Sequence, residues 1–264
     1  MASLLIKTFK YLQWMREDET AEKVTMIFDN CTGQNKNNCV LKLVGYLVEL
    51  GYFKRVKFLF LIAGHTKNAC DRLFNVLKAL YRLSNIYTYS QLIKKLDHSS
   101  YVTIHEATEE DFIDWSSFLK EYYRDLVSEV KINHLFKAHE GGRGDDQFTM
   151  ELRESALEQH KPKQFNLLPV KYRGVSGRPQ MIRDARNNGN LRRIKAPGIN
   201  IYKLVELWKE YRGLIPFEFR QDPYYSKPAQ TILDAVSDEK KSRKVFNERL
   251  KDKKLMARTK RKRE

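Results

Sequence analysis

The segment VTMIFDNCTGQNKNN, residues 24–38, contains the pattern on which the interpretation of the whole sequence depends. Its first five residues are apolar or β-branched and lie between polar residues, which is typical of a short buried strand that ends at Asp29. The polar residues that follow include four asparagines, one glutamine and one glycine. Because a segment of helical periodicity begins directly after them, the pattern predicts a loop that joins a strand to a helix.

Helix and strand patterns alternate on both sides of this segment. Apolar residues recur at intervals of three and four over 4–15 and 37–50, which predicts two helices. The apolar run within 54–64 predicts a second strand, and a third helix is expected over 67–83. This order, with strands that are apolar on both faces, favours an α/β fold in which helices sandwich a parallel sheet. The expected core face of the third helix consists of Leu73, Phe74, Leu77 and Leu80.

Patterns after residue 87 are weaker and predict less of the core. The expected elements are a helix over 88–97 capped by Thr88, a strand over 101–107, a helix over 109–126, a loop over 139–147, loops or edge strands over 165–197, and a helix over 200–211. We therefore divide the sequence into an α/β domain over 1–140, a basic extension with one helix over 141–227, and a charged tail over 228–264 that is helical or disordered.

The charge of the chain is strongly positive and unevenly distributed. Its 264 residues include 49 Lys and Arg against 33 Asp and Glu, a formal net charge of +16. The last 25 residues, 240–264, contain 13 Lys and Arg against three acids. Such a tail is typical of nucleic-acid contact or nuclear import, and its alternative is a solvated helical tail that keeps the chain soluble. A nuclear or cytoplasmic location is expected, and the tail favours the nucleus.

Composition argues against two classes of protein. The mean hydropathy is −0.61 and no apolar run reaches the roughly 18 residues that span a bilayer, so no membrane partner is expected. Three cysteines are an odd number without a framework-like spacing, which favours a reducing compartment over a disulfide scaffold. The sequence does not decide the oligomeric state.

Two polar turns follow the two predicted strands. Asp29 ends the first strand, and a turn containing His65 follows the second, with Asp71 early in the next helix. Ligand sites in parallel sheets lie at the carboxyl ends of strands, and carboxylates there suit Mg²⁺ or Mn²⁺. The alternatives are an Asx turn at Asp29, a dipole-compensating role for Asp71 and a structural role for His65.

Further polar residues of the two turns are candidates for contact with phosphate. Amide side chains donate to phosphate or sugar oxygens and lysines add positive charge, which assigns nucleic-acid contact to Asn30, Gln34, Asn35, Lys36 and Lys67.

Other chemistries have weaker support. The cysteines lack the CxxC pairs of a zinc site, no orienting partner marks a cysteine nucleophile, and the GxxxxGK[ST] spacing of a P-loop is absent from the sequence.

The motifs FDNCTGQNKNN and AGHTKNACDRLF resemble the signature of an uncharacterised, transposon-associated domain family with a ribonuclease H-like, DDE-transposase-type domain. The resemblance is strong over 23–87 and loose over 207–219. It implies that Asp29 matches the second catalytic acid, that Asp71 is the candidate for the third with His65 beside it, and that both acids bind Mg²⁺ or Mn²⁺. It also implies metal-dependent phosphoryl transfer on nucleic acid, with DNA favoured over RNA, to which the basic segment 161–195 and the tail would add affinity.

The sequence departs from the family pattern at its beginning. It starts at the first helix, so the N-terminal β-hairpin with the first catalytic acid is missing and an incomplete ribonuclease H-like α/β fold is expected. The missing hairpin would leave a sheet edge exposed. We therefore expect a truncated transposase-like or nuclease-like protein that is inactive as this fragment. The alternatives are a non-catalytic nuclear protein that binds nucleic acid or a partner, and a nonfunctional relic. The sequence does not decide whether the chain is an enzyme.

Overall fold

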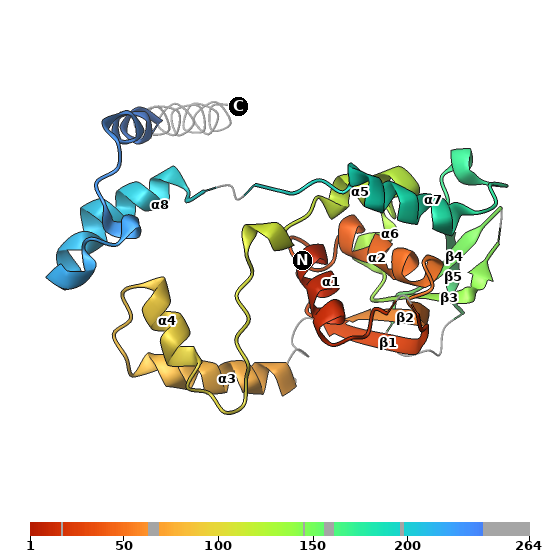
Figure 1. Ribbon diagram of the computed structural model, residues 1–264, viewed down its shortest axis with the longest axis horizontal. Coiled ribbons are helices and arrows are strands. Elements are labelled where there is room, and N and C mark those ends of the chain that lie inside the picture. The colour runs from red at the N-terminus through yellow and green to blue at the C-terminus, as the bar shows by residue number, and fades with distance from the viewer. Residues whose placement is uncertain (17, 63–68, 145, 156–160, 196–197, 240–264) are drawn as a thin grey trace, which may run out of the picture. The chain divides into compact units, whose positions relative to one another are not determined.

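The computed structural model describes residues 1–16, 18–62, 69–144, 146–155, 161–195 and 198–239 (Figure 1). The chain forms two compact units, which are described separately. The first, here called the sheet unit, contains 1–75 and 105–195, and the second, the helical unit, contains 76–104 and the described residues after 195. The predicted domain boundary after residue 140 therefore differs from the division in the structure.

A five-stranded sheet lies at the centre of the sheet unit, and its order follows the chain. The strands are β1 (Ala21–Phe28), β2 (Phe53–Phe60), β3 (Leu135–Arg143), β4 (Phe148–Arg153) and β5 (Lys163–Asn166). β1 and β2 are parallel, as predicted, whereas the pairs β2–β3, β3–β4 and β4–β5 are antiparallel. The fold is therefore mixed α/β, but the sheet is not parallel throughout.

The prediction of a loop over 139–147 is wrong for its first five residues, because they belong to β3. The glycines that suggested a loop lie at an irregularity in the pairing of β3 with β4, between Ala138 and Arg143. At Gly142 a Cβ atom would lie only 2.8 Å from the Thr149 hydroxyl, so the close approach of the two strands requires glycine. The boundary predicted after residue 140 also falls inside this strand.

Side chains alternate across the sheet, and one face forms the core. Val56 and Phe58 of β2 are fully buried, while Arg55 next to Val56 is exposed. The expectation that helices sandwich the sheet therefore does not hold, because the strands bury only one face well. The residues of the buried face are Val24, Met26, Phe28, Val56, Phe58, Phe60, Phe136, Ala138, Met150 and Leu152.

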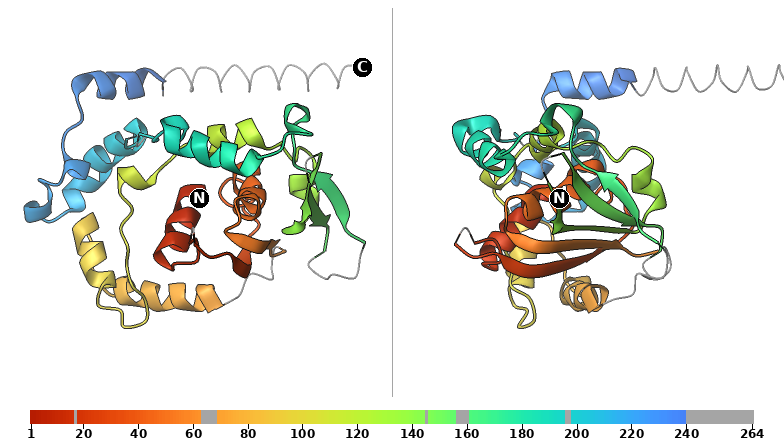
Figure 2. Two further views of the ribbon diagram at one scale, coloured as in Figure 1. Left: turned by 45° about the vertical axis from the view of Figure 1, so that its right-hand side comes forward. Right: turned by 90° about the vertical axis from the view of Figure 1, so that its right-hand side faces the viewer.

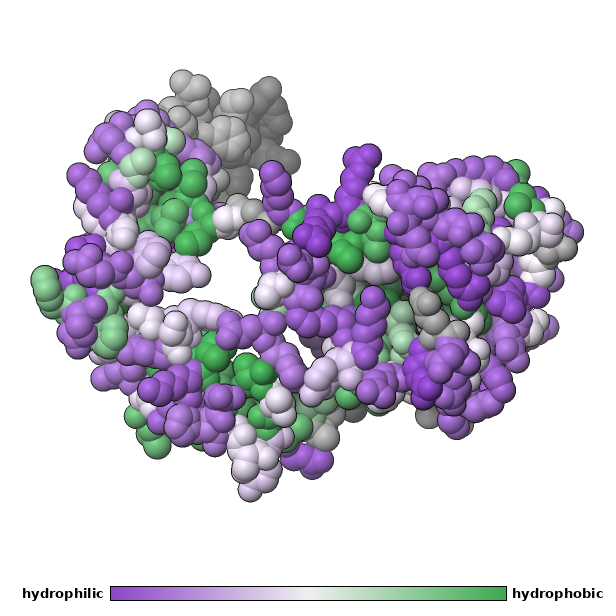
Figure 3. All heavy atoms as spheres, viewed as in Figure 1, coloured by the Kyte–Doolittle hydropathy of each residue, from purple (hydrophilic) through white to green (hydrophobic). Residues whose placement is uncertain are grey.

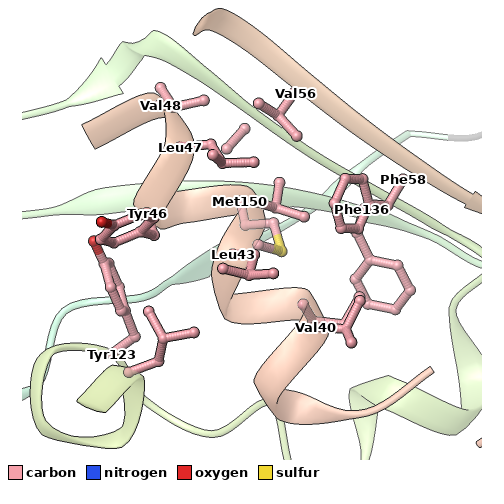
Figure 4. Close-up of a cluster of buried hydrophobic side chains, with 14 of the residues drawn as sticks. Val40, Leu43, Tyr46, Leu47, Val48, Val56, Phe58, Tyr123, Phe136 and Met150 are labelled. Atoms are coloured by element: carbon pink, nitrogen blue, oxygen red, sulfur yellow. The ribbon is translucent and has the colours of Figure 1, made fainter. Parts of the chain in front are cut away.

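Helix α2 (Asn38–Glu49) covers this face, and its residues from Val40 to Glu49 are all buried. Its side chains meet those of β2, β3 and β4 in the core (Figure 4). A Cβ atom at Gly45 would lie 2.6 Å from the Leu167 side chain, so α2 approaches its neighbours more closely than alanine would permit. This helix was predicted from its periodicity, and the prediction is confirmed within one or two residues at each end.

Four further helices complete the sheet unit. They are α1 (Ala2–Tyr11), α5 (Trp115–Tyr122), α6 (Glu129–Ile132) and α7 (Arg178–Ala185). α1 and α5 pack against α2, and Figure 1 shows these helices and α7 on the same side of the sheet. Hydrophilic residues dominate the surface of this unit in the space-filling view, with apolar residues visible between them (Figure 3).

Two secondary-structure predictions for residues 101–126 are wrong. The strand expected over 101–107 is irregular backbone, and the helix expected over 109–126 is a short 3₁₀ turn followed by α5.

Helix α3 (Ala69–Arg82) forms where it was predicted, but its expected core face is not buried, since Leu73 is 44% and Phe74 is 59% exposed. Helical periodicity identified the helix without identifying a partner for its apolar side.

The helical unit contains two further predicted helices. α4 (Tyr89–Leu96) begins with the expected cap, in which the Thr88 side chain accepts from the backbone of Gln91. α8 (Ile201–Glu206) begins after Asn200, and 230–239 is also helical. Among the described helices, none combines the length and the hydropathy that a bilayer crossing requires.

A buried ion pair joins α2 to α7. Glu49 and Arg178 are each 3% exposed, and the guanidinium donates to both carboxylate oxygens, at 2.7 and 2.8 Å. The Tyr123 hydroxyl donates to the same carboxylate at 2.7 Å. Although burial alone would lower it, the hydrogen bonds and charge of Glu49 raise the pKa of Arg178. Burial raises the pKa of Tyr123 well above its ordinary value, and the charge of Glu49 adds to this effect.

Other arginines donate hydrogen bonds to the backbone carbonyl groups at the carboxyl end of α2. Arg143 donates to the backbone carbonyl of Glu49 at 2.9 Å, and Arg183 donates to that of Leu50 at 2.5 Å. Carbonyl groups at the end of a helix lack partners within the helix and carry the negative end of its dipole. Positive side chains from β3 and α7 therefore fix the place at which α2 ends.

Replacing Arg178 with alanine is expected to destabilise the sheet unit severely. The substitution leaves the Glu49 carboxylate buried without its counter-charge, which typically costs about 3–5 kcal/mol of unfolding free energy. Urea unfolding followed by tryptophan fluorescence measures this difference. A Glu49→Leu, Arg178→Met double substitution removes both charges and should recover most of the lost stability.

The exposed ion pair between Lys171 and Glu121 supplies the control. A Lys171→Ala substitution removes a charge from the same region, but both partners of this pair are more than half exposed. Its unfolding midpoint should match that of the unmodified chain. Equal midpoints for Arg178→Ala and Lys171→Ala would show that the buried pair does not hold the unit together.

Candidate functional site

The loop between β1 and α2 is compact and internally hydrogen-bonded. The backbone carbonyl of Cys31 accepts from the backbone N–H groups of Gln34, Asn35 and Lys36, at 3.3, 2.9 and 3.0 Å. The Asn37 side chain then caps α2 by accepting from the N–H of Val40 at 3.1 Å. These bonds place the predicted polar residues at the carboxyl end of β1, beside the start of α2.

Asp29 lies at this end of β1 with an exposed side chain, and the Asn35 amide donates a hydrogen bond to its carboxylate. The side-chain oxygens of Asn30 and Asn35 are buried, and neither has a hydrogen-bond partner. Buried acceptors are normally paired, so two such oxygens in one loop call for a donor or a cation. The amide nitrogen of Asn35 contacts Asp29 directly.

The carboxylate and amide oxygens of this loop are ligands of the kind that a hard divalent cation prefers. Mg²⁺ and Mn²⁺ are held by carboxylate and amide oxygens together with water and phosphate, and Mg²⁺ commonly takes only one or two carboxylates from the protein. Asp29 provides the carboxylate, and Asn30 and Asn35 provide unpartnered oxygens. Within the described ranges, no group of three or more His, Cys, Asp and Glu side chains could hold a metal ion.

Lys36 does not fit its predicted role. It is 1% exposed, its ammonium donates to the backbone carbonyl of Lys131 at 3.3 Å, and it lies over the Phe60 ring. A side chain in this position cannot contact a phosphate on the surface. Burial lowers the pKa of the Lys36 ammonium, because the charged form loses its hydration.

The other amides of the loop divide into structural and exposed groups. Asn38 accepts from the backbone N–H of Leu126 at 2.7 Å, which ties the start of α2 to the chain after α5. Asn37 donates to the backbone carbonyl of Gln34 at 3.0 Å and so closes the loop. The Gln34 side chain is exposed at the surface of this loop, where a phosphate contact is sterically accessible.

The second predicted turn is only partly described. Asp71 lies in the first turn of α3 with an exposed side chain. His65 and Lys67 lie outside the described residues. The structure therefore brings Asp29 and Asn35 together, with Asn30 next to Asp29 in the chain, and the meeting of Asp29 with Asp71 stays a prediction.

The basic segment 161–195 was expected to bind nucleic acid, but more than half of its basic side chains have a partner within the sheet unit. Of its ten Lys and Arg residues, six have partners within the sheet unit. These six are Lys163, Lys171, Arg178, Arg183, Arg186 and Arg193. The segment acts mainly as part of the fold, and its proposed role in binding loses much of its support.

Charged residues on the strands were not identified as candidates from the sequence. Lys23 and Arg55 are exposed on neighbouring strands, and both line a hollow together with His139. The signal was present in the segment KRVKFLF, 54–60, in which charged and buried residues alternate. The apolar centre of this segment predicts a strand buried on both faces, which hides the alternation.

The fold and the loop define a mixed α/β protein with a candidate cation site at the carboxyl end of an edge strand. Residues 1–156 match the model of a family described as a domain of unknown function (DUF7869), and because the match covers more than half of the sequence, the chain belongs to this family. Neither the curated proteins nor the solved structures contained a match. The family match ends before β5 and α7, which complete the sheet unit.

Replacing Lys36 with methionine is expected to stabilise the protein at neutral pH. Because the pKa of Lys36 is lower in the folded chain, folding at neutral pH buries a charge at a cost. This cost disappears as the pH rises from the lowered pKa through 10.5, the ordinary value of lysine. The gain from Lys36→Met should therefore be larger at pH 7 than at pH 10, as measured by urea unfolding.

Lys42 provides a matched control, because it is also buried but pairs with Asp125 at 2.7 Å. Lys42→Met removes this ion pair and should destabilise the chain at pH 7. A Lys36→Met variant that is destabilised at pH 7 as strongly as Lys42→Met would contradict the interpretation of Lys36 as a buried and poorly compensated charge.

Proposed function

We propose that this chain derives from a mobile-element transposase or nuclease of ribonuclease H-like ancestry and acts on nucleic acid through a divalent-metal site at Asp29. The observation that carries the proposal is the loop after β1, where the Asp29 carboxylate accepts from Asn35 and the oxygens of Asn30 and Asn35 have no partner. The resemblance of the two polar motifs to a transposon-associated signature supports the same reading.

The residues of this loop have separate roles in the proposed site. Asp29 supplies the charged ligand, and the Asn35 amide holds the carboxylate in place. An Mg²⁺ or Mn²⁺ ion in such a site activates a nucleophile and stabilises a leaving oxygen in phosphoryl transfer. Gln34, exposed on the same loop, is the residue best placed to donate to a phosphate oxygen. Asp71 is proposed as the second carboxylate.

A single-acid site is sufficient for binding a cation but poor for cleavage. The described loop contributes one carboxylate, whereas two-metal phosphoryl transfer normally uses several. We therefore propose that this chain binds metal and nucleic acid and cleaves weakly or not at all by itself. DNA is the preferred partner, and the basic tail favours action in the nucleus.

The second candidate function is nucleic-acid binding without catalysis. The observation that favours it is that the residues described by the structure contain no cluster of three or more His, Cys, Asp and Glu side chains, together with the strong positive charge of the chain. On this alternative, the carboxylate and amides of the loop shape the turn and the start of α2, and nucleic acid binds without a metal ion.

Substituting Asp29 with asparagine is expected to weaken Mn²⁺ binding at least about 10-fold, because the charged ligand is lost. Isothermal titration of the full chain with Mn²⁺ measures the dissociation constant, and a plasmid-nicking assay with Mg²⁺ or Mn²⁺ reports any cleavage. Any nicking activity of the unmodified chain should decrease about 100-fold or more in the variant.

Asp184 on α7 supplies the matched control, since Asp184→Asn makes the same chemical change on the exposed side of another element. It should leave Mn²⁺ affinity and nicking unchanged. Mn²⁺ affinity that is the same in Asp29→Asn and in the unmodified chain would overturn the proposed site. Nucleic-acid binding that persists with no metal affinity in either protein would favour the non-catalytic alternative.

A further inference from the structure

The face of the sheet opposite α2 carries side chains in three rows, which the strand register defines. The first row is Lys23, Arg55 and His139; the second is Thr25, Lys57, Lys137 and Glu151; the third is Ile27, Leu59, Leu135 and Arg153. Residues directly opposite one another on neighbouring strands project to the same face of a sheet. The first two rows are therefore polar and mainly basic, and the third is largely apolar.

The charge of this face is strongly positive. Five of its residues are Lys or Arg and one is Glu, so its formal charge is +4 with His139 neutral. The only acid in the three rows, Glu151, accepts from Lys137 at 3.1 Å and lies 3.5 Å from His139. The Glu151 carboxylate therefore interacts with side chains of β3, while Lys23 and Arg55 are exposed on the other side of the face.

A hollow marks the first row. Lys23, Arg55 and His139 line it together with Glu22, Lys54, Glu140 and Gly141. The formal charge of its lining is +1 with His139 neutral, because Glu22 and Glu140 offset two of the three cations Lys23, Lys54 and Arg55, and Lys54 pairs with Glu22. The exposed cations of the row therefore lie in a concave part of the surface, where an anion can contact two strands at once.

We infer that this sheet face binds the phosphate backbone of nucleic acid, with Lys23 and Arg55 as its principal contacts. The choice of partner rests on the proposed function, and the location rests on the rows and on the hollow. Lys23 and Arg55 lie directly opposite each other on paired strands, about 5 Å apart. Duplex DNA carries one charge per about 1.7 Å of its axis, so the two side chains can contact neighbouring phosphates.

Charge complementarity favours this face over the basic segment that the sequence suggested. Several cations of 161–195 pair with acids of the sheet unit, among them Lys163 with Glu129 and Lys171 with Glu121. Lys23 and Arg55 are exposed side by side on paired strands. Contacts from such side chains to phosphates are independent of base sequence and sensitive to salt.

The test compares two double variants that remove the same charge from the full chain. Lys23→Gln with Arg55→Gln alters the sheet face, and Lys163→Gln with Lys171→Gln alters paired lysines elsewhere. Fluorescence anisotropy measures the affinity of each for a labelled 20-base-pair DNA duplex and for the corresponding single strand, over a series of salt concentrations. Circular dichroism verifies that both variants remain folded.

The sheet-face variant should bind duplex DNA at least about 10-fold more weakly at 0.1 M salt, and the slope of log affinity against log salt should decrease by about 2. The control should change affinity less than about 2-fold. Equal losses in the two variants, or full affinity in the sheet-face variant, would overturn the assignment. Tighter binding to polyglutamate or to anionic lipid vesicles than to DNA would also overturn it, because the partner would then be another polyanion.

Mn²⁺ titration of the same sheet-face variant separates this inference from the proposed metal site. Lys23 and Arg55 are not among the proposed ligands, so their substitution should leave Mn²⁺ affinity unchanged. Loss of DNA affinity in the sheet-face variant with no Mn²⁺ binding in any protein would support the surface and reject the metal site. Mn²⁺ binding that depends on Asp29, with DNA affinity unaffected by the sheet face, would give the opposite result.

Discussion

One buried ion pair, between Glu49 at the end of α2 and Arg178 at the start of α7, joins two distant parts of the sheet unit. Taking two charges out of water is expensive, and the cost is repaid only where the geometry and the additional hydrogen bonds are good. Here both guanidinium contacts are short, and Tyr123 supplies a further donor to the carboxylate. The pair fixes α7 against the same helix that covers the sheet, so two distant parts of the chain share one core (Figure 2).

The amide-rich loop after β1 has a more definite structure than its composition suggests. Asn37 caps α2, and Asn38 connects that helix to the chain after α5, so half of the four asparagines serve the backbone. The other two, Asn30 and Asn35, have unpartnered oxygens, and Asn35 also holds Asp29. The candidate site is therefore smaller than the motif, and the rest of the motif gives the site its shape.

Local patterns predicted the part of the fold that depends on local periodicity. β1, α2 and β2 were found because their apolar residues recur with the period of a strand or a helix, and Asp29 was placed correctly at the end of β1. β3 and β4 were not predicted, because pairing between distant segments positions them and the glycines of β3 resemble a loop. The burial of Lys36 was also missed, since tertiary packing against Phe60 decides it. For the same reason, periodicity gave α3 an apolar side without showing that this side is exposed.

The ion pair also has a consequence for how this chain can change over generations. Glu49 lies within the stretch that the family model matches, and Arg178 lies 22 residues beyond its end at residue 156. Loss of either charge alone leaves the other stranded in the core, so the two positions are expected to vary together among descendants. A recombination that joined the matched stretch to an unrelated downstream sequence would inherit a carboxylate without its partner. The structural unit is therefore longer than the stretch that the family model matches.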